Sequence, residues 1–152
     1  MSKLSKGFTL IELLLVIAII GILATVTVVA INPQRQLAKA RDSQRKTDLY
    51  SIATAVYQYA SEHSGDLPDT DGNPLTSNFP TSATCIGEGG SCFNLSVAGD
   101  TEPIVPIYMA AMPYDPKTGA TDNSGYTLYI TTGGRIVLAA TPETEATITI
   151  TK

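Results

Sequence analysis

The sequence has few of the side chains that enzymes most often use for catalysis. It contains one histidine and two cysteines among 152 residues. The histidine, His63, belongs to no Ser-His-Asp ordering, and no glycine-rich phosphate-binding motif is present. Without these groups, no catalytic mechanism can be assembled from the sequence. We therefore expect a protein that is not an enzyme and that uses no cofactor.

Charge is almost absent from one long segment near the N-terminus. Glu12 is the only charged residue between Phe8 and Gln34, and none occurs from residue 13 to residue 32. About 20 apolar residues are enough for a helix to cross roughly 30 Å of hydrocarbon. A carboxylate at the bilayer centre costs about 2.5–3.5 kcal/mol on insertion scales, and such residues are usually functional. We therefore expect a transmembrane helix whose Glu12 meets a specific partner.

Basic residues are scarce beyond this segment, except in one short stretch. Residues 49–152 hold three Lys or Arg against eleven Asp or Glu, a net charge of −8, so nucleic acid is not an expected partner. The exception, here called the basic collar, consists of Arg35, Lys39, Arg41, Arg45 and Lys46. Lipid head groups, acidic domains of neighbouring copies and plain solvent are all possible surroundings for the collar.

The N-terminus does not fit an ordinary cleavable signal peptide. Lys3 and Lys6 precede the apolar run, but the run exceeds the usual 7–15 residues, and its one weak cleavage site lies inside it. Gly7 is the only small residue placed like a boundary. A cut after Gly7 would remove a hydrophilic leader, residues 1–7, and would leave the apolar helix on the mature chain.

The stretch around this boundary resembles the type IV pilin-like family, which includes pilus subunits and the pseudopilins of type II secretion. The matching residues are Lys6-Gly7 followed by Phe8-Thr9-Leu10-Ile11-Glu12-Leu13-Leu14 and the apolar helix. A weaker likeness continues through residues 57–59 and 65–68. The resemblance implies cleavage after Gly7 by a prepilin peptidase and N-methylation of Phe8. It also implies a stay in the bacterial inner membrane as a single-pass protein, then a homo-oligomeric extracellular or periplasmic filament that can include other pilin-like subunits.

In this family, the residue that matches Glu12 pairs with the N-terminal ammonium of a neighbouring subunit. A new α-amine has a reference pKa of about 7.7–8.0, so it is mostly cationic at neutral pH. Breaking a buried ion pair of this kind costs about 3–5 kcal/mol. A simpler alternative remains open, because Thr9 and Glu12 also have the spacing of a helix capping box. Capping predicts that Glu12→Gln lowers stability, whereas docking predicts stable monomers that assemble poorly.

Three other roles also remain open at this point. A type II secretion pseudopilin shares the same N-terminal motif. A membrane-tethered module that binds a ligand or DNA without polymerising would tolerate Glu12→Leu, and an unprocessed anchor would keep Met1.

We expect an α+β fold, with one long N-terminal helix packed on an antiparallel sheet of three or four strands. The helix should run through a hydrophobic segment, 8–34, with a kink near 29–33 before Pro33, and continue from 35 to 63. Leu49, Ile52, Ala53, Val56 and Ala60 form one helical face, and Gly65 and Pro68 mark the end. Within the soluble domain, 35–152, an irregular loop, 64–103, precedes a sheet, 104–152. Candidate strands are 104–109, 126–131, 135–140 and 147–151.

The two cysteines, Cys85 and Cys92, lie within the expected loop. If the domain lies outside the cytoplasm, we expect them to form a disulfide, worth roughly 2–3 kcal/mol by loop entropy. An acidic cluster, Asp66, Asp69, Asp71 and Asn73, lacks the calcium-loop register because Pro80 stands where a glutamate is required. Asp115 and Asp122 show no matching ligand pattern either. We expect all of these to be solvated turn residues and expect no metal site.

Overall fold

The computed structural model describes residues 7–72, 77–99 and 102–152. The chain divides into two compact units, the first ending at Leu37 and the second comprising Ala38–Lys152. The described elements are α1 (Leu10–Ile31), α2 (Pro33–Glu62), β1 (Thr84–Cys85), a π-helical turn η1 (Ile104–Tyr108), β2 (Tyr126–Ile130), β3 (Ile136–Ala140) and β4 (Ile148–Thr151). The predicted α+β class is confirmed.

The apolar segment forms α1, which begins and ends at recognisable signals. The Thr9 side chain caps the first turn by accepting a hydrogen bond from the Glu12 backbone N–H. The helix ends where Asn32 adopts the left-handed conformation, with φ 47°, next to Pro33, which has no N–H to donate. The break expected near residues 29–33 is therefore present. By length and composition, α1 is able to cross a membrane.

The second helix, α2, carries the predicted apolar face into the core. Leu49, Ile52, Ala53, Val56 and Ala60 are all buried. The helix ends at Glu62, and the N–H of Gly65 returns to the carbonyl of Ala60 at 2.8 Å while Gly65 adopts φ 100°. Glycine is favoured at this position because it has no Cβ to strain the left-handed backbone. The predicted stop near residues 61–65 is confirmed.

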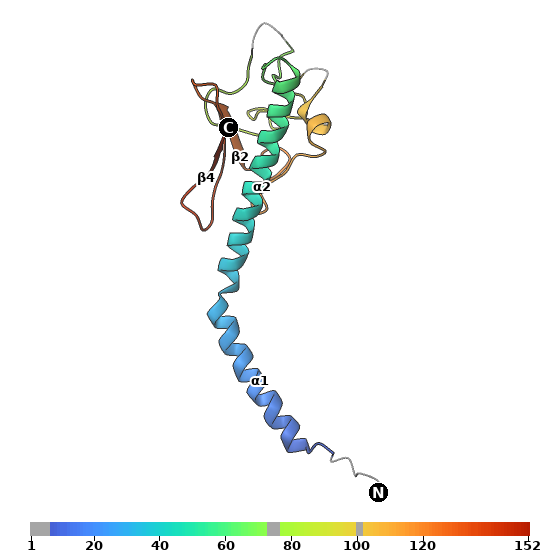
Figure 1. The fold of residues 1–152 in the computed structure, drawn as a ribbon, viewed down its shortest axis with the longest axis vertical. Coiled ribbons are helices and arrows are strands. Elements are labelled where there is room, and N and C mark those ends of the chain that lie inside the picture. Colours follow the sequence, from blue (N-terminus) through green and yellow to red (C-terminus); the bar gives the residue numbers. More distant parts are fainter. Residues whose placement is uncertain (1–6, 73–76, 100–101) are drawn as a thin grey trace. The chain divides into compact units, whose positions relative to one another are not determined.

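The sheet is antiparallel and has the strand order β1-β2-β3-β4. The hairpin between β2 and β3 closes through Thr131 and Arg135, whose N–H and O atoms lie 2.9 Å apart. This contact confirms the hairpin predicted around Thr132-Gly133-Gly134. Strand β4 confirms the last strand predicted near 147–151. Leu128, Leu138 and Ile148 join the α2 stripe in a single hydrophobic core beside the helix (Figure 1).

Two expectations about the strands are wrong. Residues 104–108 form the turn η1 instead of a strand, and the turn is closed by the Met109 N–H, which donates to the Ile104 carbonyl at 3.0 Å. Pro106 has no N–H to give to a ladder, which disfavours a strand there. Conversely, the connector 64–103 was expected to be irregular but supplies β1. A strand of two residues is too short to show an alternating pattern in the sequence. Because β1 pairs with β2, the sheet is not confined to residues 104–152.

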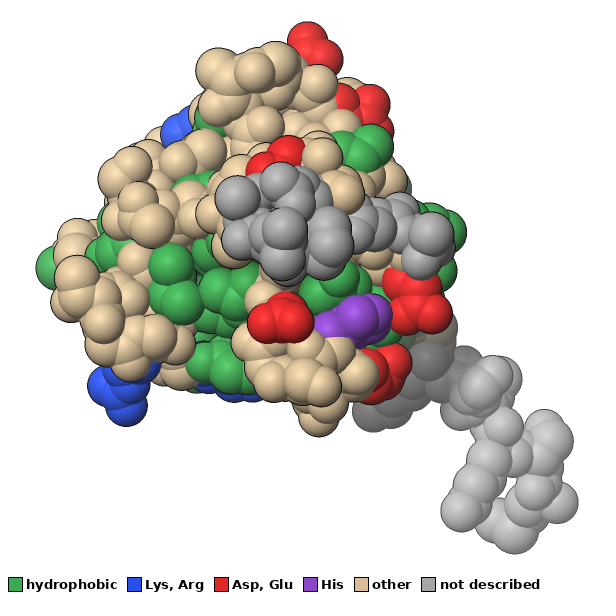
Figure 2. Space-filling model, turned by 90° about the horizontal axis from the view of Figure 1, so that it is seen from above, with side chains coloured by type: hydrophobic (Ala, Val, Ile, Leu, Met, Phe, Trp, Pro, Cys, Tyr) green, Lys and Arg blue, Asp and Glu red, His purple; other side chains and the backbone are tan. Residues whose placement is uncertain are grey.

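The surface of the second unit agrees with its acidic composition. On the face shown in Figure 2, acidic side chains lie at the top, at the right and near the middle of the view, whereas Lys and Arg are sparse. Apolar side chains lie in a shallow hollow on the same face.

Candidate functional site

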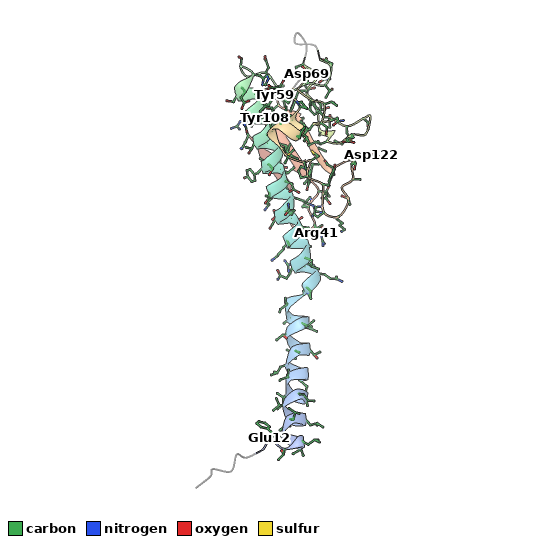
Figure 3. The ribbon with its side chains drawn as sticks, turned by 90° about the vertical axis from the view of Figure 1, so that its right-hand side faces the viewer. Glu12, Arg41, Tyr59, Asp69, Tyr108 and Asp122 are labelled. Carbon is green, nitrogen blue, oxygen red and sulfur yellow. A yellow bond between two sulfur atoms is a disulfide. The ribbon has the colours of Figure 1, made fainter. Side chains whose placement is uncertain are left out.

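Glu12 lies in the first turn of α1, and its carboxylate is exposed (Figure 3). The Thr9 hydroxyl lies 3.3 Å from the Glu12 backbone N and 3.4 Å from the Glu12 Oε2. The first contact is one half of the predicted capping box, but the Glu12 carboxylate meets the Thr9 hydroxyl instead of the Thr9 backbone N–H. Within the described residues, Glu12 forms no ion pair. Its charge is therefore available to a group outside the chain.

The rest of α1 presents apolar surface in every direction. None of its residues is buried, and its side chains project on all sides of the helix (Figure 3). Its few hydroxyls are satisfied internally, since Thr25 donates to the Gly21 carbonyl at 2.9 Å and Thr27 donates to the Ala24 carbonyl at 2.8 Å. Such back-bonding hides polar groups from a hydrocarbon environment. The helix is suited to lipid or to sister helices.

The proposed processing residues lie at the exposed start of the described chain. Gly7 has no heavy atom within 4 Å of an added Cβ, and Phe8 is 79% exposed. Both are therefore open to a processing enzyme. The basic residue of the motif, Lys6, lies outside the described residues.

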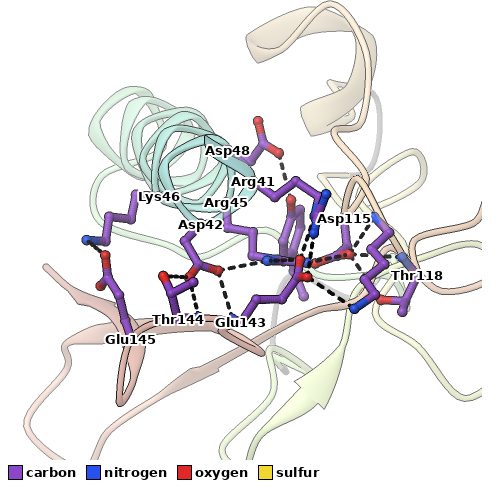
Figure 4. Close-up of polar contacts among 12 residues, drawn as sticks. Arg41, Asp42, Arg45, Lys46, Asp48, Asp115, Thr118, Glu143, Thr144 and Glu145 are labelled. Carbon is purple, nitrogen blue, oxygen red and sulfur yellow. Dashed lines mark hydrogen bonds and ion pairs between the residues drawn. The ribbon is translucent and has the colours of Figure 1, made fainter. Parts of the chain in front are cut away.

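A second polar centre, here called the Arg45 network, lies where α2 meets the loops before β2 and β4 (Figure 4). Arg45 is 2% exposed and contacts three carboxylates. Its Nε lies 2.5 Å from Asp115 Oδ2, and its Nη1 lies 2.8 Å from Asp42 Oδ1 and 2.9 Å from Glu143 Oε1. A buried guanidinium needs such partners because its desolvation is costly.

Neighbouring groups complete the hydrogen bonding of this network. Arg41 binds Glu143 through two bonds of 2.7 Å, and Lys117 also contacts Glu143, at 3.1 Å. Asp42 accepts from the backbone N–H groups of Glu143 and Thr144 and from the Thr144 hydroxyl, at 2.9, 2.8 and 2.7 Å. Among the described residues, no buried side-chain polar atom lacks a partner.

The network holds its carboxylates in the ionised form. For Asp42 and Asp115, burial by itself raises the pKa, but the hydrogen bonds they accept outweigh it. The bonds from Arg45 and from the backbone of Lys117 and Thr118 lower the pKa of Asp115 to about 2. The bidentate contact with Arg41 lowers the pKa of Glu143 well below its ordinary range. All three groups are therefore charged at neutral pH.

These contacts revise the interpretation of the basic collar and of Asp115. Arg45 is buried against acidic groups of its own chain, Arg41 pairs with Glu143 while 31% of its side chain stays exposed, and Lys46 pairs with Glu145 at the surface. Asp115 is 4% exposed and is not a solvated turn residue. The Asp42 and Arg45 spacing of three residues was a local signal for an ion pair. Nothing local indicated Asp115 or Glu143, which lie 70 and 98 residues from Arg45.

The disulfide expected between Cys85 and Cys92 is present. The loop that it closes lies against the segment that carries Asp115. The Gly89 N–H donates to the Asp122 carbonyl at 2.9 Å, and the Glu88 N–H donates to the Thr121 carbonyl at 2.9 Å. The disulfide loop therefore supports one side of the Arg45 network.

The acidic residues considered for calcium do not come together. Asp69 and Asp122 lie apart in Figure 3, and Asp69 accepts a turn hydrogen bond from the Gly72 N–H at 3.2 Å. Asn73 lies outside the described residues. Within the described part of the chain, no cluster of three potential metal ligands is found.

Comparison with known proteins agrees with the N-terminal motif. The sequence profile described as "Prokaryotic N-terminal methylation motif" matches residues 2–28. The type IV major fimbrial protein FimA of Dichelobacter nodosus is 33% identical over 112 residues, which cover 67% of this chain and 69% of the relative. A fimbrial protein of Neisseria meningitidis is 40% identical over 88 residues, which cover 58% of this chain and 48% of the relative.

The type IV major pilin PilA of Myxococcus xanthus is 43% identical over 58 residues, which cover 38% of this chain and 26% of the relative. No solved structure shows a significant match. The similarity extends well beyond the N-terminal motif in the Dichelobacter protein, and the apolar α1 and the α+β fold agree with it. The chain therefore belongs to the type IV pilin family, whose members are structural subunits and not enzymes.

Proposed function

We propose that this chain is the subunit of a type IV pilus-like filament and that Glu12 pairs with the N-terminus of a neighbouring copy. In this proposal, residues 1–7 are a leader removed after Gly7, and Phe8 becomes the methylated first residue. Residues 8–34 anchor the precursor in the bacterial inner membrane and then form the filament core. Residues 35–152 form the outer domain. The processing partner is a prepilin peptidase with methyltransferase activity.

The observation that carries this proposal is a carboxylate without an ion-pair partner at the start of a fully exposed apolar helix. Among the described residues, the Glu12 carboxylate contacts only the Thr9 hydroxyl, which also accepts the capping hydrogen bond from the Glu12 backbone N–H. Packing α1 against sister helices buries apolar surface, but it also buries this charge. A charge buried without a counter-ion costs several kcal/mol. The ammonium created at Phe8 supplies that counter-ion. Because the ion pair can form at only one axial position of the incoming subunit, it favours that register.

The first experiment is mass spectrometry of the N-terminus in material sheared from cells. We expect chains that begin with methylated Phe8. An intact Met1 would contradict processing and would indicate a plain single-pass anchor. Filaments confined to the periplasm would place the chain among the type II secretion pseudopilins instead of the surface pili.

The second experiment separates docking from capping at Glu12. We expect Glu12→Gln and Glu12→Leu to abolish filaments while the detergent-solubilised monomer unfolds as in wild type. Glu12→Asp keeps the charge and serves as the control, with partial assembly. Capping is tested separately with Thr9→Ala, which removes the observed bond to the Glu12 N–H and should cost about 0.5–2 kcal/mol of helix stability. Normal filaments from Glu12→Leu would contradict docking through Glu12 and would indicate a filament that assembles through other contacts.

A further inference from the structure

One edge of the sheet is open, and it belongs to β4 (Figure 1). At the opposite edge, β1 is covered, because the Phe93 N–H donates to the Cys85 carbonyl at 2.7 Å and the Gly87 N–H donates to the Phe93 carbonyl at 3.2 Å. Within the described residues, no strand lies beyond β4. A strand at an open edge presents backbone donors and acceptors to any chain that can align with it.

The register shows which residues of β4 present these groups. Lys152 and Ile136 exchange both backbone bonds, at 3.0 and 2.9 Å. In an antiparallel ladder, bonded pairs alternate with non-bonded pairs. Ile150 and Ile148, paired with Leu138 and Ala140, are therefore the next bonded positions. The backbone groups of Thr149 and Thr151 consequently point away from β3, toward the free edge.

This edge is short, since β4 has four residues, but its strand lacks the charge, proline or bulge that often protects an edge. Natural edges carry Lys, Pro or a bulge that discourages pairing. Residues 146–151 read Ala-Thr-Ile-Thr-Ile-Thr, with no charge, no proline and no glycine. Six-residue segments of high β-propensity and low charge are those that pair with copies of themselves. Ile148 and Ile150 are buried in the core, so Thr149 and Thr151 remain exposed for contacts on the outer face.

The charges at the two ends of this segment favour a second copy of the same strand. Glu145 precedes the uncharged run and Lys152 follows it. An antiparallel pair centred on Thr149 places Thr147 of each copy opposite Thr151 of the other. It also brings each Lys152 toward the Glu145 end of the other copy. Threonine pairs across strands are favourable. Lys152 and Glu145 have opposite charges, although within one copy Glu145 pairs with Lys46 and Lys152 lies over the Tyr57 ring. A parallel pair would instead align like charges.

A groove between α2 and β4 leaves this side of the strand accessible. It has a volume of about 330 Å³ and is lined by Lys46, Tyr50 and Glu145 together with residues 147–150. Tyr50 is 55% exposed there.

We propose that β4 pairs antiparallel with β4 of a second copy and that this contact joins two filaments side by side. The filament part rests on the proposed function. Such a pair is two-fold symmetric, whereas neighbours within one helical filament are related by a rotation and a translation. The pairing therefore connects separate filaments. One edge contact is small and binds weakly. Each filament presents many copies of the strand, however, so many contacts form together and the overall binding is much stronger than that of one pair.

The test in filaments uses substitutions at Thr149. Thr149→Pro removes an N–H that faces the free edge, so the internal ladder keeps its bonds. Thr149→Lys introduces a charge that discourages edge pairing. Thr149→Val retains the N–H and the β-branched shape and is the control. We expect the first two to reduce the bundled fraction, measured by low-speed sedimentation and filament width in micrographs, by about tenfold or more. Total filament yield should be unchanged, and Thr149→Val should bundle as wild type.

A second measurement does not depend on filaments. In the proposed pair, the two Thr149 Cα atoms are about 5.5 Å apart, within the range that a disulfide spans. Thr149→Cys should therefore give a cross-linked dimer on a non-reducing gel of the detergent-solubilised chain, and Thr132→Cys at the exposed hairpin tip should not. Loss of filaments while the Thr149→Cys variant still cross-links would reject the filament assignment but keep the strand pair. No cross-link above the Thr132→Cys control, or bundling unchanged in Thr149→Pro and Thr149→Lys, would overturn the proposal.

Discussion

In the Arg45 network, the stability of the outer domain depends on a single buried side chain, Arg45. One guanidinium with 2% exposure is held between carboxylates that come from α2 and from two distant loops. Removing a cation from such a site leaves acidic groups buried without compensation. Surface ion pairs behave differently, because water screens both partners.

We expect Arg45→Met to lower the free energy of unfolding by about 3–5 kcal/mol, since it leaves Asp42 and Asp115 buried without their cation. Lys46→Met is the matched control. Lys46 lies one position further along α2 and pairs with Glu145, but the two side chains are 44% and 39% exposed. Its loss should cost about 0–1 kcal/mol. Urea unfolding followed by circular dichroism measures both, and equal effects would contradict the importance of burial.

The depressed carboxyl pKa values predict how stability depends on pH. A carboxyl group whose folded pKa lies below its unfolded pKa stabilises the fold above the unfolded value, near 4. That contribution disappears as pH falls through the folded pKa, which for Asp115 is about 2. We therefore expect constant stability from pH 8 to 5 and a steady decline between about pH 4.5 and 2.

Urea midpoints at a series of pH values measure this decline, and Asp115→Asn provides the comparison. This variant cannot titrate at position 115, so it should be less stable at pH 7 but lose less between about pH 4.5 and 2. Identical slopes in the variant and the wild type would remove Asp115 from the explanation.

At the scale of elements, the disulfide loop acts through close backbone contact. A Cβ added at Gly89 would lie 2.6 Å from the Asp122 carbonyl oxygen, whereas one added at Gly90 would meet nothing within 4 Å. The loop can approach the Asp122 segment this closely only because Gly89 has no side chain. The same approach fixes the segment that carries Asp115.

Gly89→Ala should therefore destabilise the domain by about 1–3 kcal/mol, because the new methyl group forces the two backbones apart. The adjacent substitution Gly90→Ala should stay within about 0.5 kcal/mol of wild type. Thermal unfolding of the two variants under non-reducing conditions measures the difference. A Gly90→Ala variant as unstable as Gly89→Ala would show that loop flexibility, not contact, is responsible.

The elements also show how far local sequence patterns reach. The buried stripe from Leu49 to Ala60, the hairpin at Thr132–Gly134 and the Glu12 motif were predictable, because each signal lies within a few neighbouring residues. The turn at Pro106 and the two-residue β1 were missed, since neither carries a periodic pattern. The two distant partners of Arg45, Asp115 and Glu143, were missed because they lie 70 and 98 residues away, and only the assembled fold brings them together.

At the scale of the whole molecule, the folding core and the assembly helix are separate. Among the described residues, every buried core residue lies in the unit Ala38–Lys152, and α1 contributes none. The outer domain thus has a complete hydrophobic interior of its own, whereas α1 needs lipid or other helices to cover its apolar side chains.

We therefore expect a fragment that begins at Ala38 to fold without detergent. It should show cooperative thermal unfolding and, because it still contains the β4 edge, the Thr149→Cys cross-link. The full-length chain should require detergent or a membrane to remain dispersed. Circular dichroism and sedimentation of the two proteins test this, and an unfolded fragment would show that α1 supports the domain.

The position of the Arg45 network has a mechanical consequence. Tension applied to α1 enters the second compact unit at Ala38, and within a few residues it reaches Arg41 and Asp42, which are bonded to Glu143 and Thr144. A pull on the helix is thus shared with a segment about a hundred residues further along the chain before it reaches the sheet. Along α2, these ionic contacts therefore come before the apolar interior, whose first buried residue is Leu49.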